Sequence, residues 1–291
     1  MLEHRLLDAH VHLWDPDTFP MPWLGGVPGL NRAFSSDEYR AHTVQAHVEG
    51  MVYVEVGVAP AFALLEAARA VSLAQQEPRL LGIVAAAPVE YGERTRTYLD
   101  ALQALGPLIK GVRRNVQDEP DAAFCLQPSF VRGVRLLAEY NYTCDVCIRH
   151  HQLAATVELA RQCPEVTFIL DHLGKPDIKG ASLDPWRAQL EQLAACPNVW
   201  LKLSGLVTEA DHQQWDVDSL RPYVEHALAV FGHDRVMFGG DWPVVLLASS
   251  YARWVEAFGE LIADLPTDSQ RAICSQTAQR VYRIDPAQSA S

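Results

Sequence analysis

Residues 6–14, LLDAHVHLW, join an apolar β-strand pattern to a His-x-His pair at the end of that strand. Alternate residues of a strand point to the same side, so His10 and His12 are expected on one face. Two neutral imidazoles that converge on one point suit a borderline metal ion such as zinc. This stretch therefore predicts a first strand that carries a candidate metal site at its carboxyl end.

Two distant segments share one organisation, in which a hydrophobic run ends at a polar residue followed by a turn. They are ILDHLGKP at 169–176 and RVMFGGDWP at 235–243, and they supply His172 and Asp241. Taken singly, each of these two residues has an alternative interpretation as an ordinary turn residue. In combination with the His-x-His pair they predict one shared site.

Apolar, β-branched runs recur along the whole chain and alternate with stretches of helical periodicity. The expected strands lie near residues 6–12, 51–57, 80–87, 109–115, 143–149, 166–172, 199–204 and 235–241. The expected helices are 61–76, 93–105, 129–140, 151–162, 186–195, 219–231 and 249–264. Eight such repeats predict an α/β fold, a single-domain (β/α)8 TIM barrel. A doubly wound sheet is the alternative, which the missing Gly-rich phosphate turn after the first strand disfavours.

Composition narrows the class of protein. The chain has 291 residues, 49% of them hydrophobic, which is ample for one domain spanning residues 1–291. Its net charge of −12 argues against nucleic acid or an anionic membrane as a partner. No apolar run is long enough to span a bilayer, and nothing before His10 resembles a signal peptide. These features predict a cytoplasmic protein and leave its oligomeric state open.

Two connections and the tail depart from the helical pattern. Residues 14–36 are rich in Pro, Gly and aromatic side chains, which is typical of a lid or binding loop. Residues 205–218 are polar and follow the seventh strand. Both leave the carboxyl ends of strands, where barrel active sites are built, so 14–36 is predicted to be an active-site loop. Residues 285–291 are predicted to be a frayed tail.

Polar side chains stand at the ends of most of the expected strands, and in a barrel they would converge on one mouth. They are His10, His12, Glu55, Arg113, Arg114, Asn115, Arg149, His150, His172, Lys202, Ser204 and Asp241. Burying so many polar groups without a function would be costly. The sequence leaves the roles of Glu55 and His150 open.

Five segments resemble the amidohydrolase superfamily, specifically its branch of sugar-lactone hydrolases. They are DAHVHLWDP at 8–16, IKGVRRNVQDEP at 109–120, DHLGKP at 171–176, KLSGLVTEAD at 202–211 and FGGDWPV at 238–244. The resemblance covers nearly the whole chain, and it implies hydrolysis of a sugar-acid lactone, such as that of a deoxy sugar like L-fucose or L-rhamnose.

The resemblance also implies a set of site residues. His10, His12 and His172 would line a metal position, with Asp241 as a further ligand and the catalytic carboxylate. The fourth strand offers Arg113 and Arg114 where binuclear members carry a bridging lysine or glutamate, which disfavours a two-metal site. Because some relatives work without metal, the prediction is one divalent ion, Zn²⁺, that catalysis can dispense with.

Lactone hydrolysis needs a base for water, an electrophile for the carbonyl oxygen and an acid for the leaving alkoxide. Asp241 can take the proton from water and return it to the ring oxygen. Zn²⁺, if present, would polarise the carbonyl or acidify the water. Without it, His10, His12, His172 and either Arg113 or Arg114 can stabilise the oxyanion. The predicted substrate-binding residues are Trp14, Trp23, Asn115, Ser204 and Trp242. Adjacent strand residues face opposite sides, so one of the two arginines is expected in the mouth, and the substrate is expected to be a neutral lactone.

Three other activities fit the same residues. A lactone isomerase would use the same carboxylate without releasing an acid, and a metal-dependent decarboxylase would release carbon dioxide. A non-catalytic sugar-acid binder would need no general base, and it would keep its function after Asp241→Asn.

Overall fold

A computed structural model describes residues 4–285, so the predicted tail beyond Asp285 lies outside the described residues. Eight parallel strands pair in chain order and form one sheet. They are β1 (Leu6–Val11), β2 (Val48–Val54), β3 (Leu80–Ala86), β4 (Ile109–Arg113), β5 (Thr143–Val146), β6 (Phe168–Leu170), β7 (Val199–Leu203) and β8 (Val236–Phe238). The predicted (β/α)8 barrel is confirmed.

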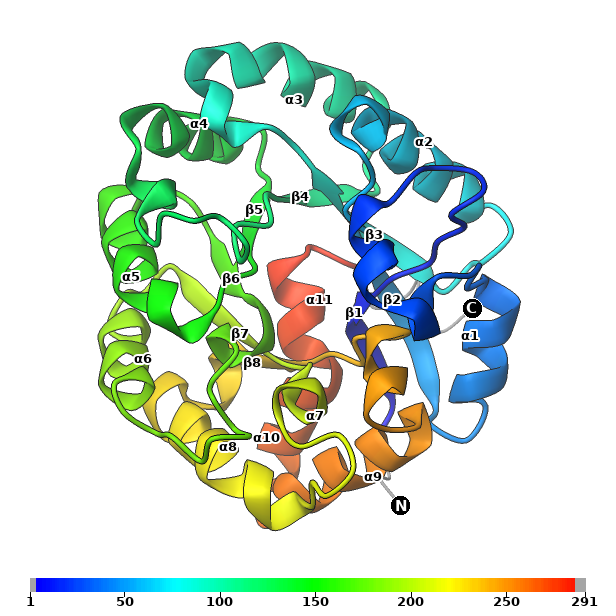
Figure 1. Ribbon diagram of the computed structural model, residues 1–291, viewed down its shortest axis with the longest axis vertical. Helices are drawn as coiled ribbons and strands as arrows, with labels where there is room; N and C mark the ends of the chain where they lie inside the picture. Colours follow the sequence, from blue (N-terminus) through cyan, green and yellow to red (C-terminus); the bar gives the residue numbers. More distant parts are fainter. Residues whose placement is uncertain (1–3, 286–291) are drawn as a thin grey trace.

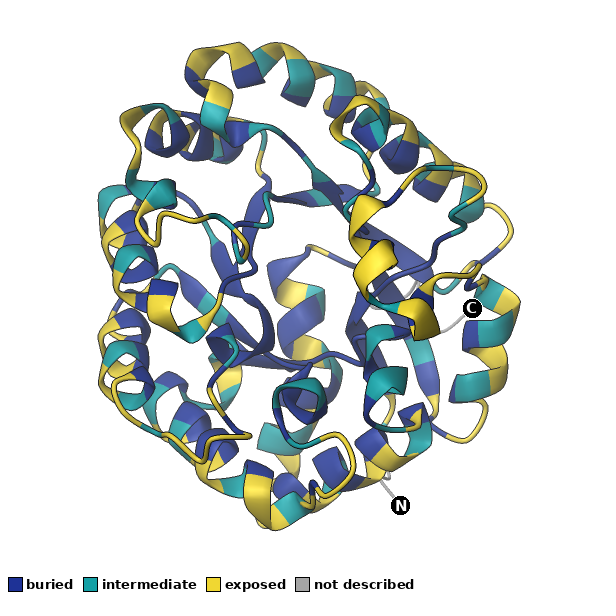
Figure 2. Ribbon diagram, viewed as in Figure 1, coloured by how far each residue is buried: buried dark blue, intermediate teal, exposed yellow. Residues whose placement is uncertain are grey.

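Most of the helices form a ring outside the strands (Figure 1). The helices of the described residues are α1 (Ser36–Thr43), α2 (Ala63–Leu73), α3 (Thr95–Ala104), α4 (Pro128–Glu139), α5 (Leu153–Gln162), α6 (Trp186–Ala194), α7 (Leu206–Glu209), α8 (Val217–Phe231), α9 (Tyr251–Leu261), α10 (Thr267–Arg271) and α11 (Thr277–Val281), with a π-helix at Ala272–Gln276. The strands are buried on both faces and the helices on one, as Figure 2 shows. This is why the strands have nearly continuous apolar sequences while the helices are amphipathic.

The barrel interior is closed at one end by the C-terminal helix, which lies at the centre of the ring in Figure 1. Ala278, Val281 and Tyr282 pack in one cluster with strand residues such as Leu7 and Val52. The opposite, carboxyl end of the strands is therefore the end that remains for an active site.

The first and last strands meet at that carboxyl end. Asp241 N donates to His10 O at 2.8 Å, and His12 N donates to Trp242 O at 2.8 Å. Buried Asp8 reinforces this seam, because its Oδ1 accepts Gly240 N at 2.7 Å. Burial raises the pKa of Asp8 to about 6, against the effect of its hydrogen bonds. The closure of the barrel thus holds the histidine pair beside Asp241.

A β-bulge in β1 adjusts the direction of His10. Asp8 pairs with Met51 and Val11 pairs with Tyr53, so β1 contains one residue more than β2 over this interval. Bulges re-aim side chains at strand ends, and here His10 and His12 both point into the barrel.

The 14–36 connection is ordered by its own contacts. Trp14 and Phe34 exchange backbone hydrogen bonds of 3.1 and 2.8 Å, which join the two ends of the loop. Two short 3₁₀ turns, Pro22–Gly26 and Pro28–Leu30, lie between them. Trp23 Nε1 donates to Val56 O at 2.8 Å and fastens the loop to the segment after β2.

Two further findings concern membrane spans and cysteines. Across residues 4–285, no helix combines the length and the apolar character needed to cross a membrane. All six cysteines are free and buried, so they form no disulfide framework.

Candidate active site

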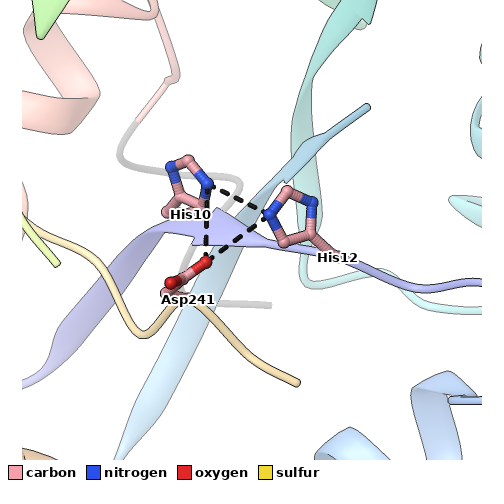
Figure 3. Close-up of side chains that lie close together, drawn as sticks. All are labelled: His10, His12 and Asp241. Atoms are coloured by element: carbon pink, nitrogen blue, oxygen red, sulfur yellow. Dashed lines mark hydrogen bonds and ion pairs between the residues drawn. The ribbon is translucent and has the colours of Figure 1, made fainter. Parts of the chain in front are cut away.

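His10, His12 and Asp241 lie together at the carboxyl end of the barrel (Figure 3). The two Nε2 atoms are 3.1 Å apart. Asp241 Oδ1 lies 3.8 Å from His10 Nε2 and 3.6 Å from His12 Nε2. All three side chains are buried, so a strand end, a bulge and the seam together bring two imidazoles and a carboxylate to one point.

His172 joins this cluster from the turn that follows β6. Its ring centroid lies 4.5 Å from that of His10, and its Nδ1 lies 2.8 Å from Ser204 Oγ. The turn holds His172 at φ 55°, a left-handed conformation that is uncommon for residues other than glycine. Gly205, at φ 65°, leaves the space for this ring, because a Cβ there would lie 2.6 Å from His172 Nδ1.

The protonation of the cluster follows from its burial. Desolvation lowers the pKa of His172 to about 4 and holds that of His10 well below its ordinary value. Burial alone would raise the pKa of Asp241, but the neighbouring His172, His12 and His10 outweigh this and keep it low. At neutral pH the cluster therefore combines neutral His10 and His172 imidazoles with an ionised carboxylate.

The donor atoms fit a divalent metal ion. His10, His12 and Asp241 form one group whose ligand atoms lie within 4.8 Å of one another, and His10, Asp171 and His172 form a second. His12 Nδ1 donates to Val54 O at 2.8 Å, which leaves its Nε2 lone pair free for a metal. Neutral imidazole nitrogens with a carboxylate oxygen are a donor set that zinc accepts.

A layer of charged groups lies directly beneath the cluster. Lys202 Nζ lies 2.7 Å from Asp145 Oδ2, 3.0 Å from Asp171 Oδ1 and 3.2 Å from His10 Nδ1. Tyr282 OH also donates to Asp145 Oδ2, at 2.5 Å. Burial would lower the pKa of Lys202, but the two carboxylates outweigh it and raise the pKa. Lys202 is therefore a buried ammonium ion that contacts a candidate metal ligand.

Arg113 lies beside the cluster and is already paired. Its Nε donates to Glu55 Oε1 at 2.7 Å, and its Nη1 donates to Asp171 Oδ2 at 3.2 Å. The same Nη1 lies 3.4 Å from His10 Nε2. Glu55, whose role the sequence left open, is thus the main partner of Arg113.

Arg114 points away from the cluster. It donates to Glu90 Oε1 at 2.9 Å and to Glu119 Oε1 at 2.6 Å, and its guanidinium lies over the Phe124 ring. The structure therefore brings one of the two adjacent arginines to the site and leaves the other in ion pairs of the surrounding wall.

The predicted substrate-binding residues are divided in the same way. The Trp14 ring centroid lies 6.3 Å from that of His12, and Trp23 packs against Trp14 at 5.5 Å. Trp242 is fully buried, with its ring against Phe34 and Tyr39. The first two tryptophans thus extend from the cluster towards the surface, whereas Trp242 packs in the wall.

The two small polar residues also differ in placement. Ser204 contacts His172 directly, as described above. Asn115 Oδ1 accepts Gln117 N at 3.1 Å within its own turn, and in the described part of the chain no side-chain hydrogen bond joins Asn115 to the four cluster residues.

The polar rim of the mouth includes Lys175, Gln117 and Glu209, which sequence patterns did not single out, beside His150, which they did. Lys175 Nζ donates to Gln117 Oε1 at 2.6 Å and lies 3.8 Å from Glu209 Oε1. His150 Nδ1 lies 3.2 Å from Lys175 O. Lys175 lies in the DHLGKP segment, which gives no sign of where its side chain points. The left-handed backbone conformation at Lys175, with φ 52°, directs the side chain to the rim.

Comparison with known proteins identifies a family, related sequences and related structures for this chain. A family model described as amidohydrolase matches residues 7–284. The L-fucono-1,5-lactonase of Burkholderia multivorans is 34% identical over 298 residues, which cover 96% of each chain. The L-rhamnono-gamma-lactonase of Scheffersomyces stipitis is 25% identical and covers 98% of this chain and all of its own. A crystal structure of an amidohydrolase from Burkholderia multivorans with bound zinc superimposes with a TM-score of 0.87, at 30% identity, over 97% of this chain and 100% of that one.

Proposed function

This chain belongs to the amidohydrolase family, and from that premise we propose that it hydrolyses a sugar-acid lactone to the free acid. The observation that carries the proposal is the ionised Asp241 held against three imidazoles at the mouth of the barrel. A binder needs no such base, and the lactonase relatives favour hydrolysis over isomerisation or decarboxylation. The similarity to lactonases of L-fucono- and L-rhamnono-lactones supports a deoxy-sugar acid as the product.

Asp241 is the group we assign to proton transfer. Its carboxylate takes a proton from the attacking water and returns it to the ring oxygen as the lactone opens. The Nε2 atoms of His10 and His12 lie 3.8 and 3.6 Å from its Oδ1, so the carboxylate stands at the same point of the mouth as the two imidazoles. Water, carboxylate and ring oxygen must then line up on one side of the lactone carbonyl.

Arg113, and without a bound metal also His172, are the groups we assign to the carbonyl oxygen. Arg113 Nη1 reaches the cluster, and Glu55 and Asp171 fix the guanidinium in place. A fixed positive group aimed at the position of a developing oxyanion stabilises the transition state without reorganisation. Ser204 orients the His172 ring through Nδ1 in the same manner.

A single divalent ion, with zinc as the proposed metal, would be held by His10, His12, His172 and Asp241. When bound, it would supply Lewis acidity for the carbonyl or for water. The zinc in the similar Burkholderia multivorans structure supports this choice.

The proposed substrate is a neutral, hydroxylated lactone. Arg113 is balanced by Glu55 and Asp171, and Arg114 by Glu90 and Glu119. Neither arginine is left free to bind a second carboxylate. We assign residues 14–36 as the active-site loop, with Trp14 and Trp23 as the wall for the apolar face of the sugar ring.

The test is a pH-indicator screen of aldonolactones, which follows release of the acid directly. We expect turnover of L-fucono- and L-rhamnono-lactones, with the free acid as the product by NMR. Parallel runs after chelation and after zinc reconstitution measure how far the reaction depends on metal. Rearranged lactone without net acid release would establish an isomerase, and absence of turnover across the panel would reject the proposal.

A further inference from the structure

His10 Nδ1 has two competing neighbours in the buried layer under the site. Lys202 Nζ lies 3.2 Å from this nitrogen and Asp171 Oδ1 lies 3.4 Å from it. An ammonium group can only donate, and a carboxylate can only accept. The two neighbours therefore favour opposite tautomers of the His10 ring.

The contact with Lys202 requires that Nδ1 carries no proton. Neutral His10 then carries its proton on Nε2, which faces His12 Nε2 at 3.1 Å. His12 can accept there, because its own Nδ1–H is committed to Val54 O. Lys202, His10, His12 and Val54 thus form one line of donors and acceptors, with His10 Nε2–H pointing into the site. Arg113 Nη1, which can only donate, lies 3.4 Å from His10 Nε2 and favours the other tautomer. That contact is longer than the contacts of His10 Nδ1 with Lys202 and of His10 Nε2 with His12.

A metal ion on His10 requires the other tautomer, in which Nε2 has a free lone pair and Nδ1 carries the proton. Asp171 Oδ1 is the acceptor available for that Nδ1–H. Within residues 4–285 this fully buried oxygen receives no hydrogen bond of good geometry, although Lys202 Nζ lies 3.0 Å away. The structure thus holds an acceptor for the metal-binding tautomer and a donor that opposes it.

We propose that Lys202 and Asp171 are positioning residues that set the tautomer of His10, and that Lys202 thereby weakens metal binding at the mouth. With Lys202 donating, His10 is a hydrogen-bond donor to whatever occupies the site. With Asp171 accepting, His10 is a metal ligand. The inference rests on the metal set proposed above and on no particular substrate.

The affinity test compares two variants that differ only at position 202. Lys202→Met in an Asp145→Asn background removes the ammonium together with one carboxylate charge, and Asp145→Asn alone is its matched control. We expect zinc to bind the double variant at least about 10-fold more tightly than the control, by competition with a fluorescent chelator. Tyr282→Phe removes a contact of Asp145 that does not reach His10, and its zinc affinity should stay within about twofold of the wild type.

The tautomer test uses the wild-type protein and needs no variant of Lys202. In ¹⁵N-histidine-labelled, metal-free protein, long-range ¹H–¹⁵N spectra distinguish protonated from unprotonated ring nitrogens, and His10→Gln identifies the His10 signals by their loss. We expect an unprotonated Nδ1 and a protonated Nε2, with the pattern reversed on addition of zinc.

Three results would overturn the inference. They are a protonated Nδ1 in metal-free His10, equal zinc affinity in the double variant and its control, and an absence of zinc binding in every variant. Lactone turnover is not among the readouts, so failure of the proposed substrate would be seen separately. If the double variant does not fold, the wild-type spectra alone decide.

Discussion

Asp241 is the residue on which the proposed chemistry depends most. It has three imidazoles around it and a backbone amide that is fixed to His10 O. We expect Asp241→Asn to lower kcat by roughly 10²–10⁴-fold, because the amide keeps the shape but cannot accept a proton. Lactone kinetics measure the loss, and circular dichroism and the melting temperature should show an intact fold. Near-wild-type turnover in this variant would show that another residue is the general base.

Ser204 acts through His172. Its Oγ is the partner of His172 Nδ1 at 2.8 Å, and it is fully buried. Second-layer partners of this kind typically contribute about 10–100-fold, so Ser204→Ala should lower kcat/KM by about 10-fold or more. Ser72→Ala, an exposed serine on α2, is the matched control and should leave kcat/KM unchanged. Equal kinetics in the two variants would show that His172 keeps its orientation without Ser204.

At this scale the sequence predicts the strand-end residues better than their partners. His10, His12, His172 and Asp241 could be found because strand periodicity and turn chemistry are local signals. The contacts of Lys202 with Asp145 and His10 join residues 57 and 192 positions apart, which no local pattern encodes. Arg114 and Trp242 stand beside residues of the site in sequence, yet their side chains face the wall.

Among the elements, the strands were the most predictable. Their double burial gives dense apolar runs, and β1, β3, β4, β5, β7 and β8 begin at the predicted residues or within one of them. Three kinds of helix were not predicted. α1 is a polar helix of eight residues that begins at an N-cap serine, α7 has one turn, and α10, the π-helix and α11 form a broken C-terminal stretch. Tertiary packing stabilises these short elements, so their sequences carry little periodicity.

Helix α2 contributes a buried acid that gives the fold a pH dependence. Glu66 Oε1 accepts Tyr53 OH at 2.8 Å and Val56 N at 2.7 Å, and desolvation, with Glu55 nearby, raises its pKa to about 8. The folded chain therefore keeps a proton that the unfolded chain releases above about pH 4.5. Between those pH values the free energy of unfolding should fall as pH rises, by up to about 1.4 kcal/mol per pH unit from this group.

Glu66→Gln measures that contribution. Denaturant unfolding gives the free energy of unfolding of the wild type and the variant between about pH 5 and 8, the window set by the pKa shift. We expect this free energy to fall with rising pH more steeply in the wild type than in Glu66→Gln. Glu158→Gln, at an exposed position of α5, should keep the wild-type slope. Parallel pH profiles for wild type and Glu66→Gln would mean that Glu66 is ionised in the folded protein.

The charge of the whole molecule bears on the choice of substrate. The formal net charge is −12, and the two arginines nearest the mouth are balanced by acids. Lys175, a partly buried cation of the rim, lies 3.8 Å from Glu209. We expect kcat/KM for neutral deoxy-sugar lactones to exceed that for lactones with a second carboxylate by at least about 10-fold at low salt, with the gap narrowing as salt screens the repulsion. Preference for the carboxylated lactones would overturn the substrate assignment and leave the hydrolytic mechanism in place.

The seam between β1 and β8 joins residues that are synthesised at the start of translation to residues that are synthesised near its end. His10 and His12 emerge among the first residues, whereas Asp241, which completes the cluster, follows after most of the chain has been synthesised. Tyr282, which supports the layer below, arrives later still. A nascent chain, or one cut short before Asp241, therefore carries these two histidines without their carboxylate. From the proposed role of Asp241, we expect such a chain to be inactive until β8 pairs with β1 and closes the barrel.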